Sequence, residues 1–447
     1  MLHRDDRVPE PAPSPFAVPL LPGPGPRRIA IISASVGAGH DGAAAGLAAR
    51  LSAHGFLVDR YDLLDLLPAG TGTLLRGTYR RMLTWAPEGY QRLYQATEHA
   101  VRPGAVWRAL FRRTQRRLLA TLRPDTCAVV STYPGACQVL GGLRRRGLLT
   151  VPALTYLTDF SVHALWVAPG IDAHLAVHAV PAAQAHAQGA AAVTVAGPVT
   201  DPRFTPRTQG QRAAARDRFG LPGHAPLALL VAGSWGVGAI RRAAAEISAT
   251  EVAVPVVVCG RNEALAAQLR QDGIEHAFGW VGDMPGLMHA CDVLVQNAGG
   301  LTSLEALAAG LPVASYRCIP GHGRTNAAAL DEAGLAAWIR DRADLGPTLT
   351  ELLHGPRGRS QRAAGLTLHR TGPGPVPAIA ARTGPQPAPR TRPAPAGRLP
   401  RGRRLALTAS TAAAIVTLGV AAPLAHTYAE TPARFAAVAH YLDGDGR

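Results

Sequence analysis

A glycine turn near the start of the sequence is followed by a histidine that could act as a base. The turn reads Gly37-Ala38-Gly39-His40, between an apolar run at residues 28–33 and an alanine-rich helical run. A strand, a turn and a helix in this order place His40 at a helix N-terminus, which favours a neutral imidazole. A neutral imidazole could take a proton from a hydroxyl group. The simpler alternative is that His40 only caps the helix.

Asp159 is the second candidate for proton transfer. It closes the segment Tyr156-Leu157-Thr158-Asp159, at the end of a predicted strand. Its carboxylate could be the base itself or could orient His40. Carboxylates at strand ends are also common N-caps, so both interpretations stay open.

The second half of the chain carries glycine turns of the kind that hold phosphate groups, at residues 233–238 and 297–303. The later turn opens a helix predicted over residues 302–309, whose N–H groups and hydroxyls can bind a diphosphate without a metal ion. A dinucleotide is disfavoured, because the first turn of the chain lacks a third glycine and no acidic residue ends the next strand in the ribose position.

Short apolar runs alternate with helical segments along both halves of the sequence. Continuous apolar strands separated by helices predict parallel sheets covered on both faces. The pattern restarts near residue 200, so we predict an α/β fold with two doubly wound, Rossmann-like domains and a cleft between them. The strands are expected at residues 28–33, 56–61, 127–132, 153–157, 173–177, 226–232, 254–259, 293–296 and 312–316.

The ends of the chain differ in composition from the middle. Residues 1–26 contain acids and many prolines, which predicts a flexible leader instead of a signal peptide. Residues 354–403 are rich in Arg and Pro, which predicts an extended linker. Residues 404–426 contain a long uncharged run behind three Arg, which predicts a transmembrane helix, with a short exported tail at 427–447. The alternative is a buried or disordered helix rich in Ala and Thr.

The basic charge of the chain is unevenly distributed. The 447 residues carry 46 Arg and no Lys against 30 acids, a formal net charge of +16. A nucleic-acid binder is the first class that this charge suggests. Residues 356–404 hold eleven of the Arg and no acid, however, so the folded part is close to ordinary in charge. The five cysteines form no C-x-x-C pair, which argues against a disulfide framework or a zinc site and favours a reducing cytoplasm.

Four segments of the second half together resemble one known family: residues 233–238, 258–262, 279–284 and 297–307. They resemble the UDP-sugar glycosyltransferases that include monogalactosyldiacylglycerol synthase, diacylglycerol glucosyltransferase and, more distantly, the GlcNAc transferase of peptidoglycan lipid II. The resemblance extends over residues 29–339 and implies a GT-B fold. It also implies inverting transfer of a hexose from a UDP-sugar to a lipid hydroxyl, such as that of diacylglycerol, at the cytoplasmic face of the cell membrane, with neither cofactor nor metal.

The resemblance further implies roles for single residues. The first domain, expected at residues 27–199, would bind the acceptor, with His40 and Asp159 as catalytic residues. The second, expected at residues 200–353, would bind the donor, and Glu305 would accept hydrogen bonds from the ribose. A solvated acid in the first helical turn is the alternative for Glu305. The residues implied in donor binding are Gly233, Ser234, Gly236, Arg261, Trp280, Val281, Gly299, Gly300, Leu301, Thr302, Glu305 and Asn326, and those implied in acceptor or membrane contact are Gly39, Tyr133, Pro134 and Trp166.

Two features bear on the substrates. Between Gly321 and Asn326 the galactolipid enzymes carry a Gln-Glu-Glu-Gly type sequence, whereas residues 322–325 here read His-Gly-Arg-Thr, so galactose, glucose, GlcNAc and a charged sugar all stay open. Residues 71–119 mix Arg with aromatic side chains, which suits an anionic membrane surface, although RNA binding would look similar. For Trp280, the expected role of the side chain is core packing.

Three other functions remain alternatives at this point. The first keeps the fold but transfers the sugar to a polyprenyl-linked or other hydrophobic acceptor. The second is epimerisation of UDP-GlcNAc on a similar two-domain scaffold. The third is a membrane protein that responds to UDP without catalysis.

Overall fold

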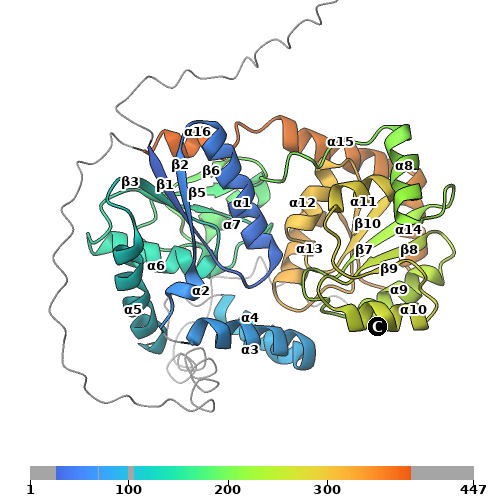
Figure 1. Ribbon diagram of the computed structural model, residues 1–447, viewed down its shortest axis with the longest axis horizontal. Coiled ribbons are helices and arrows are strands. Elements are labelled where there is room, and N and C mark those ends of the chain that lie inside the picture. Colours follow the sequence, from blue (N-terminus) through green and yellow to red (C-terminus); the bar gives the residue numbers. More distant parts are fainter. Residues whose placement is uncertain (1–26, 69, 99–104, 384–447) are drawn as a thin grey trace, which may run out of the picture.

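Two α/β domains lie side by side in the computed structural model, which describes residues 27–68, 70–98 and 105–383 (Figure 1). Each domain is built on one six-stranded sheet in which all neighbouring strands are parallel. The prediction of two doubly wound domains is therefore confirmed.

The sheet of the first domain buries both of its faces. Its elements are β1 (Arg28–Ser33), α1 (Ala38–Ala53), β2 (Leu57–Asp62), α2 (Leu63–Leu66), β3 (Thr126–Ser131), α6 (Pro134–Arg145), β4 (Ala153–Tyr156), η1 (Ala164–Trp166), β5 (Ala173–Ala176), α7 (Ala179–Ala187) and β6 (Val193–Val195). In β1, Ile29 and Ile31 pack in one hydrophobic cluster with Leu47 of α1, whereas Ala30 and Ile32 pack in a cluster on the opposite face. Burial on both faces explains why residues 29–32 of the strand are all apolar.

The sheet of the second domain repeats this design. Its elements are α8 (Gln209–Phe219), β7 (Leu227–Val231), α9 (Ile240–Ser248), β8 (Val254–Val258), α10 (Glu263–Gln271), β9 (Ala277–Phe278), α11 (Met284–Ala290), β10 (Val293–Gln296), α12 (Leu301–Ala308), β11 (Val313–Tyr316), α13 (His322–Glu332), β12 (Ala337–Ile339) and α14 (Leu345–His354). All five residues of β7 are buried.

Each sheet has one point at which the strand order reverses. The orders are β2-β1-β3-β4-β5-β6 and β12-β11-β10-β7-β8-β9, so the reversals lie between β1 and β3 and between β7 and β10. Loops that leave the carboxyl ends of such strands diverge and leave a crevice for a ligand. The sites of interest are therefore the loops after these four strands.

A helical segment between β2 and β3 extends from the first domain to the second. It consists of α3 (Thr71–Trp85), α4 (Pro87–Glu98) and α5 (Ala105–Thr121). In Figure 1, α3 and α4 lie below the junction of the two domains. The side-chain Oε1 of Gln91 in α4 accepts a hydrogen bond of 2.6 Å from the backbone N–H of Gly321 in the second domain. Residues of α4 therefore help to hold the two domains together.

Three strands were not predicted, namely β6, β9 and β12. All three lie at the edge of a sheet and have only two or three residues. A short, partly exposed edge strand leaves no continuous apolar run in the sequence. Helix α1 begins at Ala38, so His40 lies within its first turn.

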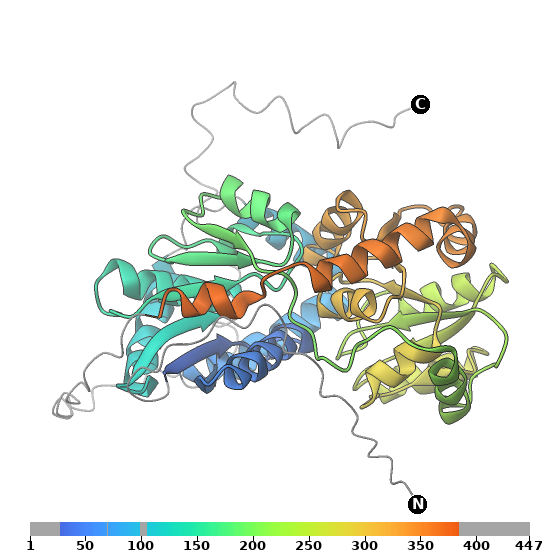
Figure 2. The same ribbon diagram turned by 90° about the horizontal axis from the view of Figure 1, so that it is seen from above.

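The expected linker at residues 354–403 is wrong in its first part. Residues 356–370 and 375–380 form α15 (Pro356–Arg370) and α16 (Pro375–Ala380), and Figure 2 shows them running from the second domain back over the first. Helix α15 docks through Gln361, whose Oε1 accepts a hydrogen bond of 2.9 Å from the N–H of Val313. Helix α16 buries the side chains of Val376 and Ile379. These buried contacts fix a segment whose composition alone suggested an extended chain.

The predicted membrane anchor is not supported either. No helix in the part of the chain that the structure describes is long and apolar enough to cross a membrane. The predicted span at residues 404–426 lies outside the described residues. Its uncharged run consists largely of Ala and Thr, which contribute little to membrane insertion. The prediction of a membrane location through a C-terminal span is therefore corrected.

Candidate active site

His40 is fixed where the loops after β3 and β4 meet α1. Its Nδ1 lies 3.0 Å from the backbone oxygen of Thr132 and 2.9 Å from Oγ1 of Thr158. A carbonyl oxygen can only accept a hydrogen bond, so Nδ1 of a neutral imidazole carries the proton. The other ring nitrogen, Nε2, is then unprotonated and able to accept a proton. This tautomer is the one that a general base requires.

Aromatic side chains enclose the His40 imidazole. The ring of Tyr133 lies edge-on at a centroid distance of 5.2 Å, and that of Trp166 lies at 5.9 Å. The indole Nε1 of Trp166 donates a 3.1 Å hydrogen bond to Oδ2 of Asp159. Trp166 is only 1% exposed, so it supports Asp159 from within the first domain and has no surface to offer a membrane. Gly39 precedes His40 in the same helical turn, and Pro134 is the first residue of α6.

Glycines shape the loops that follow β7 and β8. Gly233 and Gly236 have φ of 65° and 61°, a left-handed conformation that favours glycine. A Cβ on Gly236 would lie 2.7 Å from the carbonyl oxygen of Cys259, so the two loops touch through their backbones. The backbone oxygen of Ser234 accepts a hydrogen bond of 3.0 Å from the N–H of Arg261. This bond joins the two loops that carry residues predicted to bind the sugar donor.

Trp280 differs from its predicted role in the core. Its side chain is 54% exposed, and the guanidinium of Arg261 lies over its ring at 5.0 Å from the centroid. This cation–π contact joins the loops after β8 and β9 at the surface of the second domain. Val281, the next residue, is partly buried.

The loop after β10 leads into α12 through a close backbone turn. Gly299 has φ of 71°, and a Cβ there would lie 2.6 Å from Cβ of Asn326. Its N–H donates to the side chain of Gln296. Gly300 is the N-cap of α12, and Thr302 is the second residue of the helix. The helix N-terminus is thus free of side-chain caps and can face a ligand.

Leu301 has a second role that the sequence did not suggest. A Cβ on Gly42 of α1 would lie 2.4 Å from Cδ2 of Leu301, so this side chain packs against α1 of the other domain. The residue therefore contributes a domain contact in addition to its position at the start of α12.

Glu305 lies one turn into α12 with an unusual electrostatic setting. Burial, assisted by the charge of Asp201, raises the pKa of Glu305 to about 7. None of the described residues donates a hydrogen bond to its carboxylate or forms an ion pair with it. A carboxylate with this burial is suited to accept hydrogen bonds from a neutral ligand hydroxyl.

Asn326 connects the two domains directly. Its Oδ1 accepts a hydrogen bond of 2.7 Å from the N–H of Ser161 in the first domain. Its Nδ2 donates a hydrogen bond of 3.1 Å to the carbonyl oxygen of Ala298 in the second. The side chain is fully buried. Its expected donor contact is therefore combined with an interdomain hydrogen bond.

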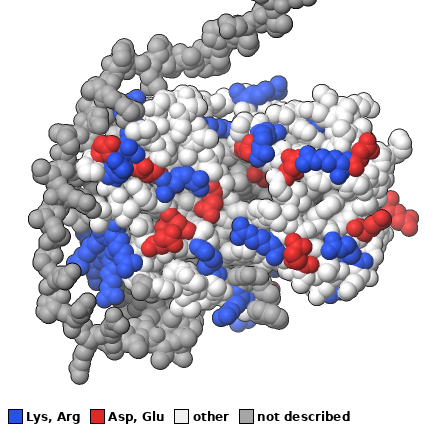
Figure 3. Space-filling view, in the orientation of Figure 1, with Lys and Arg blue, Asp and Glu red and all other residues white. Residues whose placement is uncertain are grey.

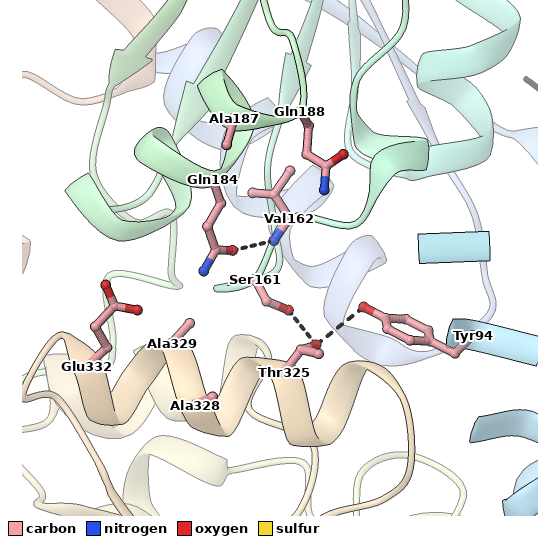
Figure 4. Close-up of a pocket in the computed structure, with 10 residues that line it drawn as sticks. All are labelled: Tyr94, Ser161, Val162, Gln184, Ala187, Gln188, Thr325, Ala328, Ala329 and Glu332. Atoms are coloured by element: carbon pink, nitrogen blue, oxygen red, sulfur yellow. Dashed lines mark hydrogen bonds between the residues drawn. The ribbon is translucent and has the colours of Figure 1, made fainter. Parts of the chain in front are cut away.

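A cavity of about 300 Å³ lies beside this connection. Figure 4 shows Ser161 and Val162 of the first domain facing α13 of the second, with the hydroxyls of Ser161 and Tyr94 both directed at Thr325. No cluster of three or more potential metal-binding side chains occurs among the residues placed by the structure.

The chain matches two known families in the same order as its two domains. The family described as Monogalactosyldiacylglycerol (MGDG) synthase matches residues 40–197, and the family described as Glycosyl transferases group 1 matches residues 229–354. The chain belongs to these glycosyltransferases. The matches cover the two domains separately, and together they include most of the candidate site.

Curated relatives and solved structures agree with this assignment. The processive diacylglycerol β-glucosyltransferase of Bacillus mycoides is 28% identical to this chain over 289 residues. The match covers 60% of this chain and 70% of the relative. Medicago truncatula UGT71G1 complexed with UDP-glucose aligns with a TM-score of 0.52 and 13% identity, covering 80% of this chain and 99% of that one. Os79 from O. sativa, in complex with U2F and trichothecene, aligns with a TM-score of 0.52 and 13% identity, covering 80% of this chain and 100% of that one. These structures establish the GT-B fold.

Several residues of the glycosyltransferase site were not predicted as such. Thr132 and Thr158 hold His40, and Ser161 meets Asn326. Thr132 directly follows β3 and Thr158 lies two residues after β4, positions that could have marked them. Ser161 had no comparable signal, because its partner lies 165 residues away in the sequence.

Proposed function

We propose that the chain transfers a hexosyl group from a UDP-sugar to the hydroxyl of diacylglycerol. The observation that carries this proposal is the fixed tautomer of His40, which leaves Nε2 ready to accept the hydroxyl proton. The names of the relatives, a diacylglycerol β-glucosyltransferase and MGDG synthase, support the acceptor class. The likeness to a UDP-glucose complex is consistent with the donor class.

In the proposed reaction the acceptor oxygen attacks the anomeric carbon of the donor sugar. His40 Nε2 takes the hydroxyl proton while the bond between that carbon and the UDP oxygen breaks, so UDP leaves with the electron pair and the anomeric centre inverts. Asp159, held by Trp166, supplies a negative charge near the imidazolium that forms. The free N–H groups at the start of α12 stabilise the charge on the departing diphosphate.

The donor is assigned to the loops of the second domain. Gly299, Gly300 and Thr302 would hold the diphosphate, and Glu305 would accept hydrogen bonds from the ribose. The turn with Gly233, Ser234 and Gly236 would border the nucleotide, and the loop with Trp280 and Val281 would contact uracil through its backbone.

The donor hexose is glucose in this proposal. The relative from Bacillus mycoides is named for glucosyl transfer. The two acids of the Gln-Glu-Glu-Gly type sequence are absent here, where Gly323 and Arg324 occupy their positions. Galactose is the competing donor, and a transfer assay with both UDP-sugars separates the two.

The acceptor side includes a basic surface on the first domain. Figure 3 shows a cluster of blue side chains at the lower left, where Figure 1 places α5. We define the basic patch as the six exposed arginines of α5 and of the end of α6: Arg112, Arg113, Arg116, Arg117, Arg145 and Arg146. Such a surface attracts anionic lipids through long-range electrostatics. We therefore place the membrane contact on this patch, with Tyr133 and Pro134 on the acceptor side of the site.

The test is a transfer assay with the full chain. Diacylglycerol, polyprenyl phosphate and a lipid-free control are each offered with radiolabelled UDP-glucose, UDP-galactose or UDP-GlcNAc. We expect labelled glycolipid with diacylglycerol and UDP-glucose. Label on the polyprenyl lipid alone would favour the alternative acceptor, and UDP binding without any transfer would favour a non-catalytic role.

A further inference from the structure

Tyr90 of α4 contacts His322 at the start of α13, across the junction of the two domains. The Tyr90 hydroxyl lies 3.2 Å from Nδ1 of His322, and the rings meet edge to face at a centroid distance of 6.2 Å. Burial raises the pKa of Tyr90 well above its usual value and lowers the pKa of His322, so both groups are neutral near pH 7. Nδ1 is thus occupied by a neutral partner, and Nε2 has no partner among the described residues.

The start of α13 lies near the loop that carries Asp159, because Asn326 of α13 accepts a hydrogen bond from the N–H of Ser161 in that loop. The charge of Asp159 acts to raise the pKa of His322, and that of His40 acts to lower it. The three residues come from three separate segments, after β4, in α1 and in α13. His322 is therefore a residue of the second domain that shares the electrostatic surroundings of the proposed base.

Aromatic packing fixes the position of Tyr90. The ring of Tyr79 in α3 lies edge-on to Tyr90 at 5.5 Å and to Trp235 at 5.9 Å. Trp235 belongs to the glycine turn after β7. The Tyr90 side chain thus packs against Tyr79 of its own helical segment, and Tyr79 connects it to the glycine turn of the second domain.

We propose that Tyr90 is a positioning residue that acts through His322, fixing its imidazole in the cleft beside His40 and Asp159. Tyr90 donates its hydroxyl proton to Nδ1, so the ring carries its own proton on Nε2. Nε2–H then offers a hydrogen-bond donor to a substrate oxygen in the cleft. The inference rests on the proposed function, because sugar transfer is the reaction that His322 would serve.

A neighbouring contact provides a matched control. Tyr94, one turn further along α4, places its hydroxyl 3.3 Å from Oγ1 of Thr325 in the same helix as His322. Tyr94→Phe removes an equivalent hydroxyl from the same pair of helices without touching His322. If α4 only docks the domains, Tyr90→Phe and Tyr94→Phe will have equal effects.

The contact itself can be tested without turnover. The full chain is labelled with ¹⁵N-histidine, the His322 signals are assigned by their loss in His322→Gln, and the ring tautomer is read from the ¹⁵N shifts. We expect His322 to be protonated on Nε2 in the unmodified chain. Tyr90→Phe should shift its Nδ1 signal or mix the tautomers, and Tyr94→Phe should leave both unchanged. An unchanged His322 signal in Tyr90→Phe would overturn the proposal, whether or not the chain transfers sugar.

The consequence is tested by a double-mutant cycle on hexosyl transfer. Loss of one hydrogen bond should lower kcat of Tyr90→Phe by up to about tenfold, with KM for the UDP-sugar and UDP affinity unchanged. In the His322→Gln background, Tyr90→Phe should not lower kcat any further. Equal losses in the two tyrosine variants, or full additivity with His322→Gln, contradict the inference. Absence of transfer by the unmodified chain would instead refute the proposed function, and the tautomer measurement would still decide the role of Tyr90.

Discussion

Nδ1 of His40 lies 3.0 Å from the carbonyl oxygen of Thr132, and this contact determines which nitrogen of the ring can act as a base. Thr132 directly follows β3, whereas His40 is in α1, so the strand and the helix must pack correctly before the tautomer is fixed. The geometry supports a role for His40 on the acceptor side of the reaction.

The first prediction concerns His40 itself. His40→Ala should lower hexosyl transfer by about 10²–10⁴-fold, because it removes the proposed general base. UDP affinity should not change, since the nucleotide is assigned to the other domain. Transfer is measured with labelled UDP-glucose, and UDP binding by calorimetry. His54→Ala, at the exposed end of the same helix, serves as the control. Retention of most of the turnover in His40→Ala would move the base role to Asp159 or elsewhere.

The second prediction follows from the raised pKa of Glu305, about 7. An ionised carboxylate accepts ribose hydrogen bonds more strongly, so UDP affinity should rise as the pH increases from 6 to 8. Glu305→Gln should weaken UDP binding by about 1.5–3 kcal/mol at pH 8. UDP has a titrating phosphate of its own, and the pH dependence that remains in Glu305→Gln measures that contribution. Equal pH profiles for the two proteins would remove the ribose assignment.

The same pKa makes a separate prediction for stability. A carboxyl group whose folded pKa lies above its ordinary value holds its proton more tightly in the folded state. Its contribution to stability is therefore lost as the pH rises from about 4.5 to about 7. Glu305→Gln should be more stable than the unmodified chain at pH 8 and equally stable at pH 4, as measured by urea denaturation. Reduced stability of the variant at pH 8 would show that the carboxylate has a favourable partner.

Glu246 should behave in the opposite way. Burial alone would raise its pKa, but hydrogen bonds from Arg317, Tyr316 and Arg242 outweigh burial and lower the pKa to about 2. The stabilising contribution is present above the ordinary pKa and is lost as the pH falls toward 2. Glu246→Gln should lower the free energy of unfolding by about 2–3 kcal/mol at pH 7 and by much less at pH 2.5. A cost that does not change with pH would mean that packing, and not charge, is responsible.

The basic patch predicts how the chain responds to lipid charge. Arg112→Glu with Arg116→Glu should reduce cosedimentation with vesicles that contain phosphatidylglycerol, and salt should weaken binding of the unmodified chain. Neutral phosphatidylcholine vesicles should bind neither protein strongly. The control reverses the same number of charges at Arg342 and Arg359, exposed residues of the second domain. Equal losses in the two double variants would show that total charge matters and that the patch does not.

The repeated α/β pattern and the positions of the glycine turns can be predicted from the sequence alone. Nine strands were predicted close to their observed bounds, because strands buried on both faces need uninterrupted apolar runs. His40 and the start of α12 could be found in the same way, since a turn between a strand and a helix is a local feature. Trp280 was misjudged, because whether an aromatic side chain is buried depends on neighbours that the local sequence does not specify.

Which of these features contact one another depends on the packing of the folded chain. Tyr90 and His322 are 232 residues apart, and Ser161 and Asn326 are 165 apart, so no local pattern could pair them. The docking of α16 on the first domain likewise depends on a few buried side chains within an Arg- and Pro-rich segment. Local periodicity records which face of an element is apolar, whereas contacts between domains depend on how two separately folded surfaces fit, and that fit leaves no periodic signal in the sequence.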